Sequence, residues 1–286
     1  MFGKVINLLF DRTAKTHAPA PLPNEPDGDL AYPWLNRVFE HLLRRRSIAS
    51  RPGYTWGILH SAFLAKSLNI QRISAIELGV AGGNGLLAME DIADAITQQL
   101  GVGIDVYGFD SAQGLPKPRD YRDTPNLWSA GAYPMNVAAL RQRLRHAELL
   151  PGLVEQTIPQ FIQRDIAPIG FVSFDLDLYS STAVAMRLLE ADPARLLPRV
   201  HCYFDDILGF TYGHHNGERL AIAEFNRDHA MRQVSEIYGL RYYLPPRHRD
   251  QPWSAKVFMA HILDHRRYND WDGQVRHARL DLKEAA

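Results

Sequence analysis

The stretch Ile169-Gly-Phe-Val-Ser-Phe-Asp-Leu-Asp-Leu-Tyr179 joins an apolar run to two carboxylates that follow it directly. A short apolar run of this kind is typical of a strand buried on both faces of a parallel sheet. The stretch Val200-His-Cys-Tyr-Phe-Asp-Asp206 repeats the arrangement further along the chain. Because open parallel sheets bind ligands at the carboxyl ends of their strands, the four aspartates predict a functional site.

Strand and helix patterns alternate around these two stretches. We expect strands at residues 73–78, 104–109, 153–157, 169–174, 200–204 and 256–262, and helices at 86–100, 135–147, 182–190 and 219–231. Strands separated by helices predict a parallel sheet with right-handed crossovers. Two more helices, at about 33–47 and 54–69, precede the first strand. The sequence therefore predicts an α/β fold with an N-terminal helical extension.

Length and composition fit a globular chain with a sizeable core. The chain has 286 residues, of which 46% are hydrophobic and 22% charged, with a formal net charge of zero. A balanced charge gives no global field that would favour nucleic acid or an anionic membrane. We expect an apolar segment with a Pro-rich linker at 1–30, the helical extension at 31–71, the main domain at 72–265 and a C-terminal tail at 266–286.

Cysteine content and hydropathy bear on location. The single cysteine, Cys202, excludes an internal disulfide and a Cys-rich zinc site, and it suits a reducing compartment. No apolar stretch approaches the ~20 residues that span a bilayer, and the start lacks the features of a secretory signal. We therefore expect a cytoplasmic protein without a transmembrane segment. The short apolar start would suit contact with a second copy, which leaves a homo-oligomer open.

A glycine-rich turn, Glu77-Leu-Gly-Val-Ala-Gly-Gly-Asn-Gly85, follows the first expected strand and leads into a helix. Such glycines let the backbone approach a ligand, although a purely structural turn is the alternative. Gly79-Val-Ala81 departs from the dinucleotide fingerprint, and there is no P-loop lysine. Glu77 would repel a phosphate but suits an amino-bearing cation, so S-adenosylmethionine fits better than a phosphate ligand. Asp110, followed by Ser111, ends the second strand where it could bind ribose hydroxyls.

The four aspartates are the second candidate site. Side-chain alternation places Asp175 and Asp177 on one side, and Asp205 and Asp206 begin the loop after the next strand. Converging carboxylates require either protons or a hard divalent cation, for which oxygen ligands favour magnesium, manganese or calcium over zinc. The alternative is that the Asp-Asp pair only caps a helix.

These motifs together resemble the macrocin O-methyltransferase family, whose members methylate sugar hydroxyls of macrolide and aminocoumarin antibiotics. The resemblance covers residues 72–262 and rests on the order of Glu77-Leu-Gly-Val, Asp110-Ser-Ala-Gln-Gly-Leu-Pro116, Asp175-Leu-Asp-Leu-Tyr-Ser-Ser-Thr182, Phe204-Asp-Asp and Gly217-Glu-Arg-Leu-Ala-Ile-Ala-Glu-Phe225. The turn differs from the family, which usually has a Trp-Arg pair before its glycines.

The resemblance implies a class I S-adenosylmethionine-dependent methyltransferase fold, a seven-stranded sheet with the last strand antiparallel. It implies cofactor contacts from Glu77, Gly79, Ala81, Asp110 and Ser111. It also implies that Asp175, Asp205 and Asp206 hold a divalent metal, with magnesium preferred, and that Asp177 is the general base. The partner would be a small-molecule hydroxyl acceptor, glycosidic in this family.

The excursion at 111–131, with Tyr121 and Trp128, is long enough to form a lid over the acceptor. His214 and His215 follow the Asp pair and could supply a base or remain solvated. Two other readings stay open. One is a catechol or phenol O-methyltransferase, which also uses carboxylates to hold metal. The other is a metal-dependent hydrolase or a non-catalytic scaffold that binds cofactor.

Overall fold

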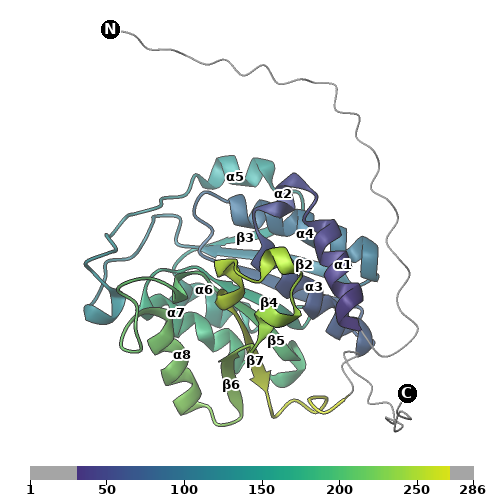
Figure 1. The fold of residues 1–286 in the computed structure, drawn as a ribbon. Coiled ribbons are helices and arrows are strands. Elements are labelled where there is room, and N and C mark those ends of the chain that lie inside the picture. The colour runs from purple at the N-terminus through teal and green to yellow at the C-terminus, as the bar shows by residue number, and fades with distance from the viewer. Residues whose placement is uncertain (1–30, 271–286) are drawn as a thin grey trace, which may run out of the picture.

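The computed structural model describes residues 31–270 of the chain. Seven strands form a single sheet, and their bounds are β1 (Arg72–Leu78), β2 (Gly103–Asp110), β3 (Glu148–Pro151), β4 (Ile169–Phe174), β5 (Leu196–Phe204), β6 (Arg232–Glu236) and β7 (Val257–Ile262). Their order across the sheet is β3-β2-β1-β4-β5-β7-β6 (Figure 1). Only β7 is reversed, because it runs antiparallel to β5 and β6 while the other neighbours are parallel. This topology confirms the expected fold class.

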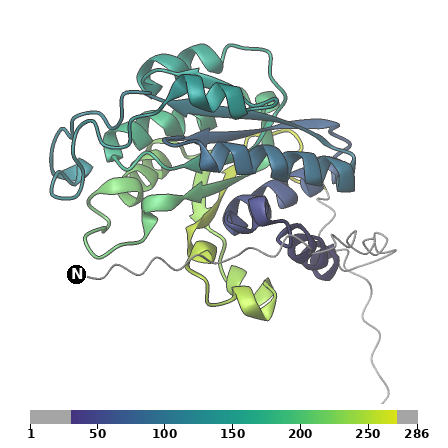
Figure 2. The same ribbon diagram turned by 90° about the horizontal axis from the view of Figure 1, so that it is seen from above.

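Helices cover both faces of the sheet (Figure 2). Their bounds are α1 (Ala31–Leu42), α2 (Arg46–Ala49), α3 (Pro52–Ser67), α4 (Asn84–Leu100), α5 (Val137–Arg143), α6 (Val154–Phe161), α7 (Tyr179–Ala185), α8 (Gly217–Asp228) and α9 (Leu240–Tyr243). Phe39 of α1, Leu59 of α3 and Met89 of α4 belong to one apolar core. Phe161 of α6 and Phe225 of α8 belong to the other. The expected helical extension is therefore packed into the same core as α4.

Helix α3 lies very close to the sheet. Its residues from Gly53 to Ala65 are buried, so this helix has no solvent-facing stripe over that stretch. A Cβ at Gly53 would collide with the ring of Tyr203, and one at Gly57 with the ring of Phe171. The missing side chains allow the helix backbone to approach β4 and β5, which brings the first turn of α3 to the carboxyl ends of the strands.

One expected strand is misplaced, so that β3 was not found at its position, and a further strand was missed altogether. Residues 153–157, expected as a strand, form the start of α6, while the strand is β3 just before it. Val154, Ile158 and Phe161 recur at helical spacing and are all buried, which explains the helix. The missed strand, β6, contains a single apolar residue, Val234, because it is an edge strand with little apolar burial. Both errors lie at the edges of the sheet.

The apolar start at residues 1–10, the linker and the C-terminal tail from 271 lie outside the described residues. Within residues 31–270, no helix is both long and apolar enough to cross a membrane.

Candidate functional site

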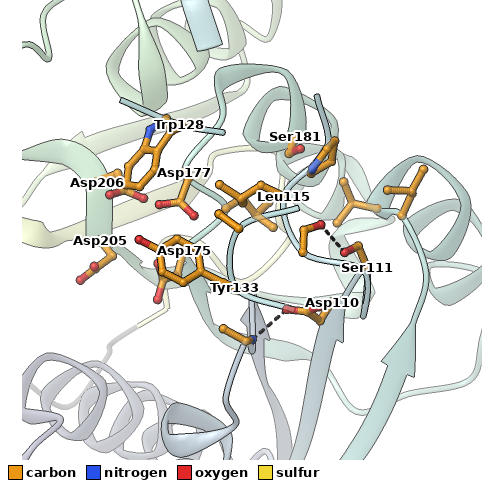
Figure 3. A pocket seen from close by; sticks show the side chains of 18 of the residues that line it. Asp110, Ser111, Leu115, Trp128, Tyr133, Asp175, Asp177, Ser181, Asp205 and Asp206 are labelled. Atoms are coloured by element: carbon orange, nitrogen blue, oxygen red, sulfur yellow. Dashed lines mark hydrogen bonds between the residues drawn. The ribbon is translucent and has the colours of Figure 1, made fainter. Parts of the chain in front are cut away.

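A cavity of about 320 Å³ opens at the carboxyl ends of the central strands (Figure 3). It lies where the strand order reverses between β1 and β4, the usual ligand position in open α/β sheets. Its walls come from the loops after β1, β2, β4 and β5 and from the segment before α6. The lining residues are Gly79, Ala81, Asp110, Ser111, Gly114, Leu115, Pro116, Trp128, Ala132, Tyr133, Leu153, Val154, Glu155, Asp175, Leu176, Asp177, Ser181, Asp205 and Asp206.

The glycine turn between β1 and α4 forms one wall. Gly79 has a φ of 87°, in the left-handed region, and a Cβ there would collide with the carbonyl of Asp175. Only glycine therefore fits at this position, and its backbone lies directly against the first of the four aspartates. Ala81 also has a positive φ, of 46°, and lines the cavity.

Asp110 holds the glycine turn in place. Its Oδ2 accepts hydrogen bonds from the Val80 and Ala81 N–H groups at 3.0 and 2.8 Å, and its Oδ1 accepts from the Ala112 N–H at 2.7 Å. A carboxylate offers about four lone-pair positions, so one remains for a ligand. Ser111 donates its hydroxyl to the Gly114 carbonyl at 2.6 Å, which commits its proton within the loop.

Glu77 does not line the cavity. Its side chain is 2% exposed and lies behind the turn, against Gly85 of α4. Its Oε1 accepts a hydrogen bond from the Tyr54 hydroxyl at 3.0 Å, and that hydroxyl accepts one from Ser173 at 2.8 Å. Burial, with a smaller contribution from Asp175, raises the pKa of Glu77 to about 8. Its expected contact with the cofactor stays a prediction.

Three of the four aspartates converge on the side of the cavity across from Asp110 and Ser111 (Figure 3). One carboxylate oxygen from each of Asp175, Asp177 and Asp206 lies within 4.8 Å of the others. Asp175 follows β4 directly, and Asp177 adopts a φ of 61°, which turns the chain after the strand. Asp206 belongs to a 3-10 turn after β5, and its buried Oδ2 has no hydrogen-bond partner among the described residues.

The carboxylates of this cluster repel one another. Burial raises the pKa of Asp175 to about 7, and the nearby charges of Asp205 and Asp206 add to the shift. Burial, followed by the same repulsion, also raises the pKa values of Asp177 and Asp206. Groups in this state need protons or a cation. The all-oxygen donor set and the unpartnered oxygen of Asp206 fit a hard divalent ion such as Mg²⁺.

Asp205 differs from the other three aspartates. Its carboxylate forms an ion pair with the Lys256 ammonium at 2.9 Å, and it is not part of the three-carboxylate group. The structure therefore places Asp177, the expected base, within the group of three carboxylates that could hold a cation. Asp205, an expected ligand, lies next to that group and outside it. The division into three ligands and a base stays a prediction.

Sequence reasoning missed several charged or polar residues at this site. Lys256 immediately precedes β7, and Arg51 precedes α3, where the nearby Glu77 and Asp175 carboxyls favour its charge. No local signal marks either residue, because the position of β7 in the sheet brings Lys256 to the aspartates and the close packing of α3 on β4 and β5 brings Arg51 there. Glu218, at the start of α8, is a further buried carboxyl near the cluster.

Of the two residues expected in a lid, only one lines the cavity. Trp128 lines the cavity, whereas Tyr121 is 69% exposed and does not. Tyr133, which was not singled out, is part of the wall and packs edge-on against Trp128 with ring centroids 6.4 Å apart. His214 and His215 are exposed and do not line the cavity.

No protein-family model and no curated protein matches the sequence. Among solved structures, the O-methyltransferase NovP is 18% identical, with a TM-score of 0.44 over 60% of this chain and 70% of that one. The calicheamicin methyltransferase CalS11 is 20% identical, with a TM-score of 0.48 over 78% and 84%. An O-methyltransferase from Bacillus cereus in complex with SAH is 14% identical, with a TM-score of 0.37 over 78% and 89%. Similarities this low do not define the reaction of this chain.

Proposed function

We propose that the protein is a metal-dependent O-methyltransferase that moves the methyl group of S-adenosylmethionine to a hydroxyl of a sugar or glycosylated small molecule. One observation carries this proposal: a single cavity is lined by both the glycine turn with Asp110 and the carboxyl group of Asp177, beside Asp175 and Asp206. A methyl donor bound at the turn would face an acceptor bound at the carboxylates. Holding the two reactants in this orientation is the main requirement of direct methyl transfer.

The cofactor side rests on the turn and on Asp110. The remaining lone-pair position of Asp110 can accept a hydrogen bond from a ribose hydroxyl, while the Gly79 and Ala81 backbone leaves room for close approach. Ser111 lines the same wall and can accept a further hydrogen bond. Glu77 would act from behind the turn, where a cationic sulfonium ligand favours its ionised form.

The acceptor side rests on Asp177, the proposed general base. A hydroxyl oxygen near Asp177 would attack the methyl carbon, the carbon–sulfur bond would break, and the hydroxyl proton would move to the Asp177 carboxylate. S-adenosylhomocysteine would then leave. The Asp177 carboxyl lines the cavity beside the candidate cation ligands Asp175 and Asp206, which is where a base for a cation-bound acceptor hydroxyl would have to lie.

A divalent cation would be held by Asp175 and Asp206, with Asp205 joining them if its ion pair with Lys256 is released. When bound, the cation lowers the pKa of a hydroxyl and offsets the repulsion among the carboxylates. The unpartnered, buried Oδ2 of Asp206 supports this assignment. None of the described residues donates a hydrogen bond to this oxygen, so it is available to a cation.

The proposed class of acceptor rests on the family resemblance and on the apolar side chains that line the cavity near the aspartates. Leu115, Trp128 and Tyr133 give the cavity apolar surface beside the aspartates (Figure 3), and Leu153 lines it as well. Flat apolar side chains can pack against the C–H face of a sugar ring, while the aspartates receive its hydroxyls. An aromatic ring would also fit this surface, which is why the phenol alternative belongs in the test.

The test is transfer of a labelled methyl group from S-adenosylmethionine to a panel of glycosides and catechols, with Mg²⁺ or with excess chelator. We expect labelled glycosides in the presence of Mg²⁺ and none with chelator. Labelling of catechols alone would support the phenol alternative. Transfer that is unaffected by chelator would refute the metal dependence, and cofactor binding without any transfer would support a scaffold.

A further inference from the structure

Glu218 is a buried carboxyl without a partner, located beside the aspartate cluster. It is the second residue of α8, and its side chain is 1% exposed. Neither Oε1 nor Oε2 meets the geometry of a hydrogen bond with the described residues, and the backbone N–H of Asp206 is the polar group that acts on this carboxyl from nearby. Leaving such a group buried is costly, and natural folds rarely retain one without a function or an additional ligand.

The surroundings of Glu218 place it against the aspartates. Its helix packs on the 3-10 turn of Asp205–Ile207, and the neighbouring Arg219 donates from Nε to the Ile207 carbonyl at 3.0 Å. The charges that act most strongly on the Glu218 carboxyl are those of Asp206, Asp175 and Asp205, in that order. Arg219, the nearest cation along the chain, turns instead to Ile207 and to Glu236, 3.8 Å away.

The charges at this place do not balance. Five carboxyl groups act on one another, namely Asp175, Asp177, Asp205, Asp206 and Glu218. The cations that most favour ionised Asp175 are Arg51 and Lys256, and Lys256 is already paired with Asp205. A divalent cation would offset most of the remaining excess. The first turn of a helix favours a negative side chain, which offsets part of the cost of burying Glu218 in its ionised form.

We propose that Glu218 is a further carboxylate of the divalent-cation site, placed behind Asp206 to strengthen cation binding directly or through a bound water. This inference rests on the proposed function, because it concerns the same site. It adds a residue from a different helix to the two aspartate motifs. The chemical class of ligand is a hard cation of the Mg²⁺ or Mn²⁺ type, for which carboxylate oxygens are the preferred donors.

The test is calorimetric titration of Mn²⁺ into the full-length protein without S-adenosylmethionine or acceptor. We expect Glu218→Gln to weaken Mn²⁺ binding by roughly ten- to a hundredfold, the range measured for residues that support metal ligands. Glu236→Gln is the matched control, because it makes the same change at an exposed carboxylate, and it should bind as the wild type does. Asp206→Asn should lose most binding.

Thermal melts separate this role from a structural one. Glu218→Gln keeps the size of a side chain whose oxygens meet no hydrogen-bond geometry among residues 31–270, so its melting temperature without metal should not fall, while the rise caused by Mn²⁺ should shrink. Glu218→Asp, which keeps the charge, should recover part of the affinity and serves if the Gln variant does not fold. If Glu218→Gln bound Mn²⁺ with the affinity of the wild type, the role of Glu218 would be refuted and the proposed metal dependence would still stand. Absence of Mn²⁺ binding by the wild type would also overturn the proposed metal dependence.

Discussion

The Lys256 ammonium lies 2.9 Å from the Asp205 carboxylate, and this ion pair holds Asp205 apart from the three carboxylates beside it. Lys256 is the last residue of the 3-10 turn Pro252–Lys256, so the segment that leads into the reversed strand β7 places a cation at the acidic site. It partly offsets the repulsion that acts on Asp175.

We therefore expect Lys256→Met to have opposite effects on stability and on cation binding. Loss of this partly buried ion pair should cost no more than about 1 kcal/mol of unfolding free energy without metal, because solvent screens much of the attraction. Mn²⁺ should bind more tightly, because a competing positive charge has gone and Asp205 is free to turn inward. Denaturant melts and calorimetry measure the two effects. Weaker Mn²⁺ binding by this variant would show that Lys256 organises the site instead of competing with the cation.

The glycine turn offers a matched pair of substitutions. Gly79→Ala forces a side chain into a left-handed conformation and against the Asp175 carbonyl, so we expect a loss of about 1–3 kcal/mol in unfolding free energy. S-adenosylmethionine binding should be lost or greatly weakened. Gly82→Ala is the control, because a Cβ there meets nothing within 4 Å. Similar binding by the two variants would argue against a role for this turn in cofactor recognition.

The buried acids predict an unusual dependence of stability on pH. The folded-state pKa values of Glu77 and Asp175, about 8 and 7, lie above the ordinary values of 4.5 and 3.8. Between pH 6.5 and 8 the folded protein therefore binds more protons than the unfolded chain, and its stability must fall as pH rises. The slope is at most about 1.4 kcal/mol per pH unit for each carboxyl.

This window avoids the opposing effect of His201. Burial lowers the pKa of His201 to about 3, so its contribution to stability is complete above the ordinary value of 6.5 and is lost only at lower pH. Urea melts in the presence of chelator measure the slope, and Glu77→Gln should reduce it. Stability that rises from pH 6.5 to 8 would contradict the assignment of raised pKa values.

Asp177 can be tested as the base without disturbing the fold. Asparagine tolerates the left-handed backbone of this position, so Asp177→Asn should fold normally. Loss of a general base should lower the transfer rate by roughly 10²–10⁴-fold, while S-adenosylmethionine binding is retained. Rapid-quench kinetics measure the rate of methyl transfer, and equilibrium titration measures the affinity for S-adenosylmethionine. A variant that transfers methyl groups at the wild-type rate would assign the base elsewhere.

The sequence predicted the centre of this fold better than its edges. Strand β4 is buried along its whole length, is mostly apolar and is followed directly by carboxylates, so the signals for the strand and for the site lie side by side in the sequence. Edge strands lack that signal: β6 carries one apolar residue and β3 has four residues in all. Near β3, the stretch that suggested a strand was 153–157. That stretch is the start of α6, whose buried residues Val154, Ile158 and Phe161 have helical spacing.

In the candidate site, too, the residues with a local signal in the sequence were predictable and the others were not. Asp110 and the aspartates after β4 and β5 were predictable because each ends a strand, and strand ends meet at one edge of the sheet. The residues around them were not. Tyr54 and Lys256 come from distant elements with no motif of their own, and the Gly217–Phe225 motif gives no sign that Glu218 is buried beside the aspartates. Nor does the sequence show that Glu77 faces Tyr54 behind the turn instead of the cavity.

The most direct test of the central claim is calorimetric titration of S-adenosylmethionine into the wild-type protein. A cofactor site at the glycine turn predicts saturable binding of one molecule per chain, retained in Asp177→Asn and lost in Gly79→Ala. No binding by the wild-type protein at millimolar S-adenosylmethionine would contradict the proposal that this chain is a methyltransferase.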